Sequence, residues 1–287
     1  MATWFWILGW ILSILTIIGN GFIIVLIYSR RRLRTKTNAF VVSLAVADFC
    51  VGLIAVPSLF VCEKTSGCDP EAPLANRVDY LRWLFGYASV TNLCSLVVDR
   101  YVAVVRPLNY ITIMKRRLVS HMILISWASS IVILIPFVLN WLVFNDNYFL
   151  FSLISWIYMI FFEFLPCCVL VFCFASMSCV VYKHERAARI LAKQLHFNHH
   201  FLYKRGEKSA VKIMAAVISV FLLAYSCSLR CTVVYLLYTE KTACDDQEYK
   251  LPLLVLNSAI NPVAYALFKR DINQEIKRRI RRVILKK

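Results

Sequence analysis

Several side chains that ionise or hydrogen-bond strongly lie inside long apolar stretches of this 287-residue sequence. Asp48 falls in the middle of the second stretch, and Asn257, Asn261 and Tyr265 follow one another at four-residue intervals in the last. Because residues four apart share one face of a helix, these three are expected to point the same way. A charge at bilayer depth costs roughly 2.5 to 3.5 kcal/mol on insertion scales, so it needs a partner or a water-filled cavity.

The third apolar stretch carries a second polar line. Arg82 and Arg100 are separated by five helical turns, about 27 Å along the axis, and Ser89 falls near the same face. Turned toward Asp48, these residues predict a hydrated polar channel through the core of a helical bundle. Such a channel suits a cation, a proton relay or a conformational switch.

Transmembrane helices are the elements that must position these residues. The sequence is 60% hydrophobic and 17% charged, whereas soluble domains average about 45 to 50% and about 25%. One span takes about 20 apolar residues. We therefore expect an all-α membrane protein with a single seven-transmembrane domain over residues 1–287 and helices near 4–28, 39–62, 77–105, 118–142, 148–182, 207–238 and 249–268.

Basic residues predict the orientation of this bundle. Of the 33 Lys and Arg residues, 27 fall in four segments, at 30–36, 100–117, 183–212 and from 269 onward. The positive-inside rule places these segments and the carboxyl terminus in the cytoplasm, with the amino terminus outside. The net charge of +17 is thus a topology signal that also favours anionic membrane lipids as partners, rather than nucleic acid. No cleaved signal peptide is expected.

The segment 270–286 has the pattern of an amphipathic helix. Isoleucines recur every four residues among Lys and Arg, at Ile272, Ile276, Ile280 and Ile284. This spacing predicts a cationic helix on the inner leaflet. A solvated basic tail would explain the charges but not the spacing.

The sequence does not predict an enzyme. It contains neither a phosphate-binding G-x-x-x-x-G-K-[ST] loop nor an H-E-x-x-H pair. His196, His199 and His200 are expected to be solvated loop residues, because no Cys or carboxylate completes a metal set. Most of the 11 cysteines fall inside spans and act as small apolar residues.

Two motifs resemble those of the rhodopsin-like (class A) G-protein-coupled receptors. A D-R-Y motif with its following loop is formed by Asp99, Arg100, Tyr101, Val105, Pro107, Leu108 and Tyr110, and an N-P-x-x-Y motif by Asn261 to Tyr265. Further matches in order are Gly19-Asn20, Leu44-Ala45, Ala47-Asp48, Trp127, Pro166 and Phe221. The resemblance spans the chain and implies a multi-pass plasma-membrane receptor that couples an extracellular ligand to a heterotrimeric G protein.

The resemblance also assigns roles to individual residues. Arg100 would be restrained at rest by Asp99 and Glu207, with Tyr101 completing the coupling motif. Release of this lock would let the sixth expected helix, at 207–238, swing. This helix would then have two positions, and the ligand would favour one of them. The residues that match the family's activation switch are Asn20, Pro166, Phe221, Tyr225, Pro262 and Tyr265.

Four polar residues match the family's sodium pocket. They are Asp48, Ser89, Asn257 and Asn261, and they carry the hard oxygen ligands that a small cation prefers. An allosteric sodium ion is therefore expected, and no other cofactor. The alternative is a water-filled polar core without an ion.

The outer half and helix six depart from the family pattern. The usual helix-three cysteine is replaced by Ala75, and the presumed second outer loop contains no cysteine. Cys62 and Cys68 are instead candidates for a local disulfide, or one of them for a bond to Cys244, and the pairing stays open. The helix-six motif C-W-x-P reads Ala224 to Cys227 and lacks the proline that ordinarily causes a kink, and Phe174 stands where a tyrosine is common. Activation by a ligand is therefore expected to be weakened or to use a different movement of the helices.

The ligand is left open by the resemblance. Amine receptors of this family carry an aspartate where this chain has Arg82, so the standard amine mode is disfavoured, although Asp79 one turn higher could hold an amine in a shifted pose. Val255 replaces the lysine that retinal requires. Arg82, Glu163 and Arg230 either pair with one another or receive the carboxylate or phosphate of an anionic lipid or peptide.

A different class of protein would use the same charges. Asp48, Arg82, Glu163 and Arg230 could line the path of a seven-helix transporter or channel. The internal repeats and matched broken helices typical of transporters do not occur in this sequence.

Overall fold

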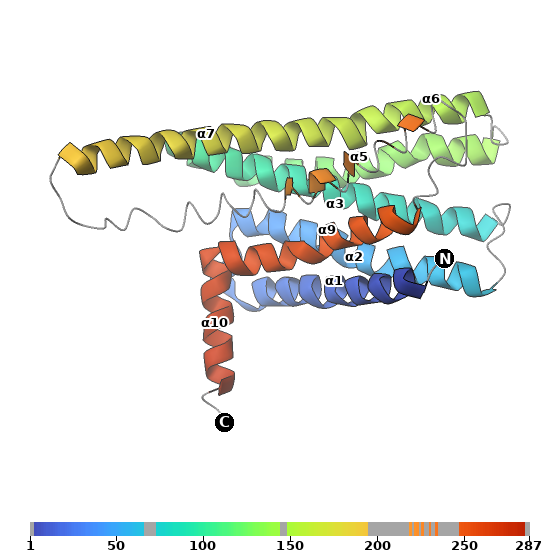
Figure 1. The fold of residues 1–287 in the computed structure, drawn as a ribbon, viewed down its shortest axis with the longest axis horizontal. Coiled ribbons are helices and arrows are strands. Elements are labelled where there is room, and N and C mark those ends of the chain that lie inside the picture. Colours follow the sequence, from blue (N-terminus) through green and yellow to red (C-terminus); the bar gives the residue numbers. More distant parts are fainter. Residues whose placement is uncertain are drawn as a thin grey trace.

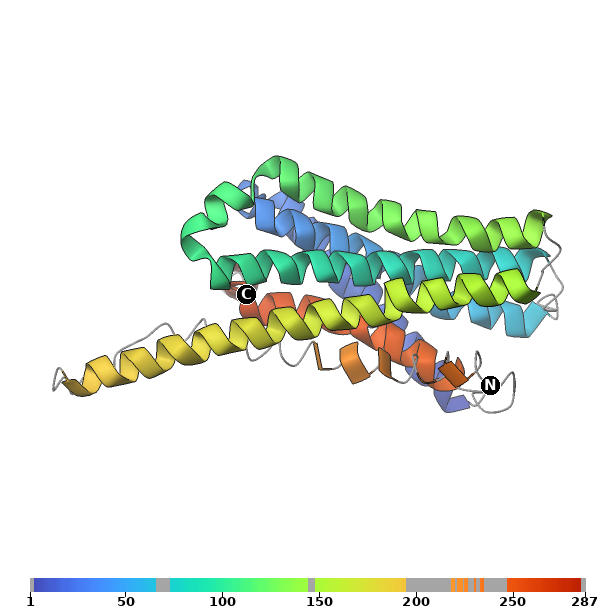
Figure 2. The same cartoon turned by 90° about the horizontal axis from the view of Figure 1, so that it is seen from above.

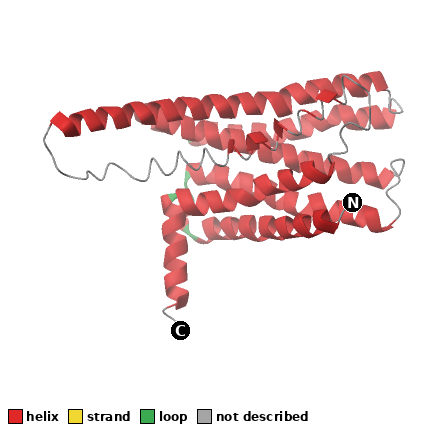
Figure 3. Cartoon of the chain, in the orientation of Figure 1, coloured by secondary structure: helices red, strands yellow, loops and turns green. Residues whose placement is uncertain are grey.

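The computed structural model describes residues 3–65, 73–143, 148–194 and 247–284, together with scattered positions between 218 and 234. Nearly all of these residues are helical, and none of them lies in a strand (Figure 3). The helices are α1 (Thr3–Ser29), α2 (Lys36–Thr65), α3 (Pro73–Val105), α4 (Tyr110–Ile113), α5 (Arg116–Val143), α6 (Tyr148–Tyr158), α7 (Leu165–Gln194), α9 (Gln247–Phe268) and α10 (Arg270–Ile284).

Short segments of other helix types join these elements. Arg31–Leu33 and Pro107–Asn109 form 3₁₀ turns at the ends of α1 and α3. Met159–Phe164 forms a π-helical segment between α6 and α7. The residues expected to form one helix over 148–182 are therefore continuously helical, with a π-helical stretch between two α-helical parts. The helix expected over 207–238 lies mostly outside the described residues, and its described positions from 218 to 234 are helical.

The helices have membrane dimensions. Five described segments are long and apolar enough to cross a bilayer: Thr3–Ser29, Lys36–Val61, Tyr80–Val105, Arg116–Pro136 and Ser152–Ala187. A sixth candidate joins Leu251–Ala266 of α9 to Asp271–Arg279 of α10 with a bend of 82°. Large apolar side chains such as Ile7, Ile18 and Val25 on α1 are more than half exposed, as expected for a surface that faces lipid rather than water.

α3 occupies the centre of the bundle. It packs against α2, α5 and α7, while α1 packs against α2 and α9 (Figures 1 and 2). A large apolar cluster that includes Leu44, Val97 and Met177 fills the half of the bundle nearer α10. A smaller cluster around Phe5, Val56 and Leu251 fills the other half. Polar side chains at the level of the large cluster are therefore enclosed by packed helices.

Two glycines allow close contact between helices around the polar core. A Cβ added at Gly19 would lie 3.0 Å from Cγ of Pro262 on α9, and one added at Gly52 would lie 3.2 Å from the backbone oxygen of Ser13 on α1. The Ser13 hydroxyl donates to the Gly52 carbonyl across the same contact. α1 is thus held directly against the first turn of the N-P-x-x-Y motif.

α7 continues beyond the bundle. It was expected to end near residue 182 but runs to Gln194, and Figure 2 shows its last turns projecting past the other helices. The added segment is rich in Ala, Glu, Lys, Arg and Leu, which are strong helix formers outside a membrane as well as inside it.

α10 turns away from α9 by 82° and leaves the bundle (Figure 1). Ile272 is buried and Ile276 is partly buried against the large apolar cluster, whereas Lys277 and Arg278 are exposed. Arg30 Nε lies 2.9 Å from Glu275 Oε1, and Arg279 Nη2 donates to Ser29 Oγ at 2.7 Å, so polar contacts dock α10 on the end of α1.

Candidate functional site

The polar core centres on Asp48, which is fully buried in α2. Ser89 Oγ of α3 donates to Asp48 Oδ1 at 2.6 Å, and Asn261 Nδ2 of α9 donates to Asp48 Oδ2 at 2.8 Å. The consecutive helices α2 and α3 and the distant helix α9 therefore converge on one carboxylate. Both of its oxygens accept a hydrogen bond, as a buried carboxylate requires.

Ser258 is a further member of this core that the sequence reasoning missed. Its buried hydroxyl lies near the Asp48 carboxyl and acts on it electrostatically, and its backbone oxygen accepts from Asn20 Nδ2 at 3.2 Å. Asn257, which was expected in the core, has a buried Nδ2 without a hydrogen-bond partner among the described residues. Ser258 lies three positions before Asn261 and so shares its helix face, a signal that could have identified it.

A second polar cluster ties α2, α3 and α5 together. Ser43 Oγ donates to Asn92 Oδ1 at 2.7 Å, and Trp127 Nε1 donates to Ser43 Oγ at 2.9 Å. Asn92 Nδ2 donates to the backbone oxygen of Ala88 at 2.7 Å. Trp127, one of the residues that match the family pattern, thus has a structural role in α5, because its indole N–H fixes α5 against α2.

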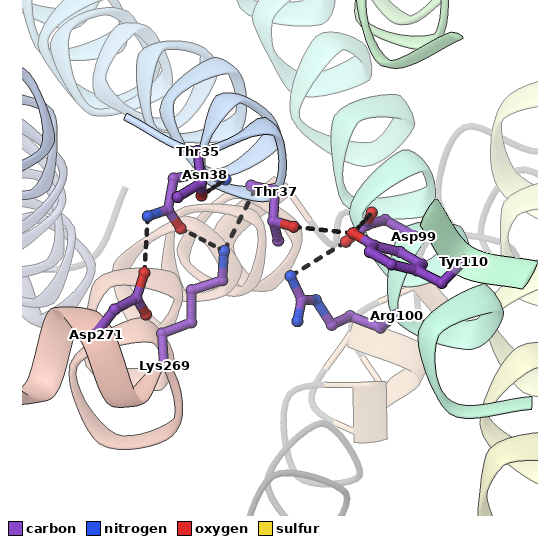
Figure 4. Close-up of polar contacts among 8 residues, drawn as sticks. All are labelled: Thr35, Thr37, Asn38, Asp99, Arg100, Tyr110, Lys269 and Asp271. Atoms are coloured by element: carbon purple, nitrogen blue, oxygen red, sulfur yellow. Dashed lines mark hydrogen bonds and ion pairs between the residues drawn. The ribbon is translucent and has the colours of Figure 1, made fainter. Parts of the chain in front are cut away.

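The Asp99–Arg100 pair lies at the α10 end of α3. Asp99 is fully buried, and its Oδ2 lies 3.1 Å from Arg100 Nη2. Its Oδ1 accepts from the Tyr110 hydroxyl at 2.9 Å, and that hydroxyl lies 3.0 Å from Thr37 Oγ1 (Figure 4). A phenol has a single hydrogen, so Thr37 must donate to Tyr110 while Tyr110 donates to Asp99.

The protonation of Tyr110 supports this order of donors. Burial raises the pKa of Tyr110, and the charge of Asp99 raises it further, while the hydrogen bond from Thr37 and the charge of Arg100 oppose the shift. The phenol therefore keeps its hydrogen at neutral pH. Glu207, the other expected partner of Arg100, lies outside the described residues.

Lys269 lies at the junction of α9 and α10 and was not singled out by the sequence. Its Nζ donates to Asn38 Oδ1 at 2.7 Å and to the backbone oxygen of Thr37 at 3.4 Å. Asn38 Nδ2 in turn donates to Asp271 Oδ2 at 2.9 Å and to the backbone oxygen of Leu33 at 2.7 Å. Burial, followed by the charge of Arg100, lowers the pKa of Lys269 well below its usual range, while Asp271 and Asp99 oppose this shift.

The expected switch residues are buried in the same half of the bundle. Phe221 and Tyr225 stack with ring centroids 4.1 Å apart, and Pro166 is the second residue of α7, just after the π-helical segment. Tyr265 is buried, and its hydroxyl has no hydrogen-bond partner among the described residues. Tyr101 is half-buried, with its ring 5.9 Å from that of Phe172 on α7.

The ligand candidates occupy different environments. Glu163 is buried in the π-helical segment and accepts from the Tyr158 hydroxyl at 3.5 Å. The Tyr158 ring lies 4.8 Å from that of Tyr87 and 6.3 Å from that of Trp83. The Glu163 carboxyl is thus bonded to one member of a cluster of aromatic rings from α3 and α6.

The remaining candidates are the two arginines and Asp79 for the ligand, and three cysteines for a disulfide. Arg82 is half-buried on α3, whereas Arg230 is exposed. Asp79 lies on α3, but its side chain is outside the described residues. The same holds for the side chain of Cys62 on α2 and for the whole of Cys68 and Cys244, while the described cysteine side chains are free thiols.

A helical bundle of membrane dimensions, with a buried polar core and an Asp–Arg pair at one end, defines an integral-membrane protein of the receptor type. The chain belongs to the 7 transmembrane receptor (rhodopsin family), whose family model matches residues 19–265. The fold is thus the all-α seven-helix bundle that the sequence predicted, and the resemblance to rhodopsin-like receptors is confirmed.

Similar proteins include several amine receptors. The chain is 26% identical to octopamine receptor beta-2R of Chilo suppressalis, over 93% of this chain and 77% of that protein. It is 28% identical to octopamine receptor beta-1R of Drosophila melanogaster, over 96% of this chain and 61% of that protein. A shorter match, 38% identical over 46% of this chain and 28% of the relative, is to the D(1B) dopamine receptor of Mus musculus. The chain thus spans less than two thirds of some of these relatives.

Proposed function

We propose that this receptor passes an extracellular ligand signal across the plasma membrane to a heterotrimeric G protein at the α10 end of the bundle. The observation that carries the proposal is the Asp99–Arg100 pair, which is buried on the carboxylate side and 3.1 Å across. Its Arg100 side chain is about one third exposed and is therefore within reach of a partner. The concentration of Lys and Arg at this end supports a cytoplasmic position.

The coupling step is a change of partner for Arg100. At rest the guanidinium pairs with Asp99, whose other oxygen is held by Tyr110. Glu207 adds a second carboxylate in this proposal. When the helix predicted over 207–238 moves, Arg100 leaves these carboxylates and meets the G protein. A ligand that favours the moved helix therefore raises the population of the signalling state.

We also propose an allosteric sodium ion in the polar core. The oxygens of Asp48 and Ser89 lie together, and carboxylate and hydroxyl oxygens are the donor type a small hard cation takes. Asn261 directs its amide nitrogen at Asp48, so it supports the carboxylate rather than the cation in this geometry. When bound, the ion supplies a positive charge that favours the resting packing of α2, α3 and α9.

For the ligand, we propose an anionic group that Arg82 receives, as in an acidic lipid or peptide. The relatives are named for octopamine and dopamine, which favours an amine instead, but a guanidinium on α3 opposes a cation in the standard position. A guanidinium matches a carboxylate or phosphate with two parallel hydrogen bonds. An amine held at Asp79 is the competing case.

Guanine-nucleotide exchange by membranes that contain the receptor tests the coupling proposal. Arg100→Ala is expected to abolish agonist-stimulated exchange, whereas Arg106→Ala, at the exposed arginine that directly follows α3, is expected to leave it intact. Exchange that is indifferent to Arg100 would count against a receptor switch at this pair and for transport as the protein's activity.

The ligand proposal is tested by screening acidic lipids, acidic peptides and biogenic amines with the same assay. Arg82→Ala is expected to weaken anionic agonists at least tenfold, and Arg82→Asp is expected to abolish their effect. Equal potency of every agonist on wild type and on Arg82→Ala would show that Arg82 does not contribute to ligand binding.

A further inference from the structure

A continuous path of polar contacts connects α10 with the Asp99–Arg100 pair (Figure 4). It runs from Asp271 through Asn38 to Lys269, and from Lys269 to the first turn of α2. From the same turn, Thr37 reaches Tyr110, which bonds Asp99. The contacts up to Asp99 are hydrogen bonds of 2.7–3.4 Å, and the last is an ion pair of 3.1 Å between Asp99 and Arg100.

Lys269 occupies the central place in this path. It is the single non-helical residue between α9 and α10, so its backbone fixes where α10 begins. Its Nζ holds both the side chain of Asn38 and the backbone oxygen of Thr37. An amine nitrogen donates in either protonation state, so the lowered pKa of Lys269 does not remove these bonds.

Thr37 carries the effect of Lys269 toward α3. Its backbone oxygen accepts from Lys269, while its side-chain hydroxyl must donate to Tyr110. A shift of the first turn of α2 therefore moves the group that holds the Tyr110 hydroxyl in place. The other bond of the Tyr110 hydroxyl among the described residues is to Asp99 Oδ1, and Oδ2 of the same residue pairs with Arg100.

We propose that Lys269 is a positioning residue for the Asp99–Arg100 pair and acts through Thr37 and Tyr110. This inference rests on the proposed function, because it concerns how readily Arg100 is released for coupling. The junction of α9 and α10 thereby sets the basal activity of the receptor. α10 is a control element for the switch as well as a helix that rests on the membrane.

Lys269→Met tests the inference, because it removes the donor and keeps an unbranched side chain. Loss of the bond to Thr37, which lies on the route to Asp99, is expected to raise basal nucleotide exchange by about two- to tenfold, the population change that corresponds to one net hydrogen bond. Lys277→Met is the matched control, since Lys277 is exposed on α10 and its replacement removes the same charge. Thr37→Val removes the hydroxyl with little change of shape, so it is expected to reproduce the effect even if Lys269→Met folds poorly.

The route through Tyr110 is tested by a double-mutant cycle. In a Tyr110→Phe background the bond to Asp99 is already lost, so Lys269→Met is expected to add less than a factor of two. A full and independent effect of Lys269→Met in that background would show that Lys269 acts only by anchoring α10, and would overturn the inference. Unchanged basal exchange in both Lys269→Met and Thr37→Val would overturn it as well.

A spectroscopic readout separates this inference from the proposed function. With 3-fluorotyrosine at position 110, the fluorine resonance is expected to shift in Lys269→Met and to stay in place in Lys277→Met. A resonance unmoved by Lys269→Met contradicts the inference, whatever the receptor activates. Failure of the coupling proposal would show instead as exchange that ignores Arg100→Ala, which leaves the resonance result intact.

Discussion

Replacing Asp48 by alanine is expected to destabilise the bundle substantially. The change leaves Ser89 Oγ and Asn261 Nδ2, which donate to the carboxylate at 2.6 and 2.8 Å, inside a core where Asp48 itself is fully buried. Each buried donor left unsatisfied costs about 1–3 kcal/mol, so the two together cost about 2–6 kcal/mol. In a protein of this size each kcal/mol lowers the Tm by roughly 2–4 °C, which gives an expected fall of at least about 4 °C.

Thermal unfolding of the purified receptor in detergent measures this effect. Ser58→Ala is the matched control, because Ser58 is a polar residue of the same helix. Among the described residues its hydroxyl bonds only a local backbone oxygen, that of Ala55 at 3.3 Å. The scans are run in sodium chloride and in choline chloride. Wild type is expected to have the higher Tm in sodium, and Asp48→Ala is expected to lose that difference.

Two results would refute the reasoning. A Tm for Asp48→Ala within 1 °C of wild type would show that the two donors find other partners and that the carboxylate does not organise the core. A sodium-dependent gain that survives in Asp48→Ala would remove this site as the place of ion binding while leaving the stability argument standing.

Further predictions concern packing and hydrogen bonds at other contacts. Gly19→Ala is expected to lower the free energy of unfolding by about 1–3 kcal/mol through overpacking, whereas Gly86→Ala, whose added Cβ would have its nearest neighbour at 3.8 Å, is expected to be tolerated in the same thermal assay. Trp127→Phe is expected to cost about 1 kcal/mol through loss of its indole hydrogen bond; a Tm equal to that of wild type would refute this. Arg30→Ala removes a partly exposed ion pair with Glu275 and is expected to change stability by less than about 1 kcal/mol, with any effect vanishing at high salt.

The convergence on Asp48 could be predicted from the sequence because its physical cause is local. A carboxylate in an apolar stretch needs partners, and the four-residue spacing of polar residues in the last stretch placed Asn261 on one face. The same rule named Asn257, but it is the buried Ser258 that lies near the Asp48 carboxyl. A helix face is about three residues wide, so spacing alone does not tell which neighbour points at the partner helix.

The contacts of Lys269 could not be predicted because they depend on how helix ends are arranged. Lys269, Thr37 and Tyr110 come from three separate junctions of the chain, and nothing in their spacing indicates that these junctions meet. Tyr110 was named by its resemblance to the family motif, but its bond to Asp99 came from the structure. Glu163 lies in a π-helical segment, where the periodicity of 3.6 residues per turn does not hold, so the direction of its side chain could not be predicted either.

The 82° bend at Lys269 has a mechanical consequence. Helices that cross a bilayer run close to its normal, so a helix turned by this angle lies nearly flat in the interfacial plane, with Ile272 and Ile276 inward and Lys277 toward the lipid head groups and water. α10 then fixes the depth at which the bundle lies in the bilayer. A thicker or thinner bilayer would exert a force on α10 along the membrane normal, and this force would act at Lys269, where α10 joins α9.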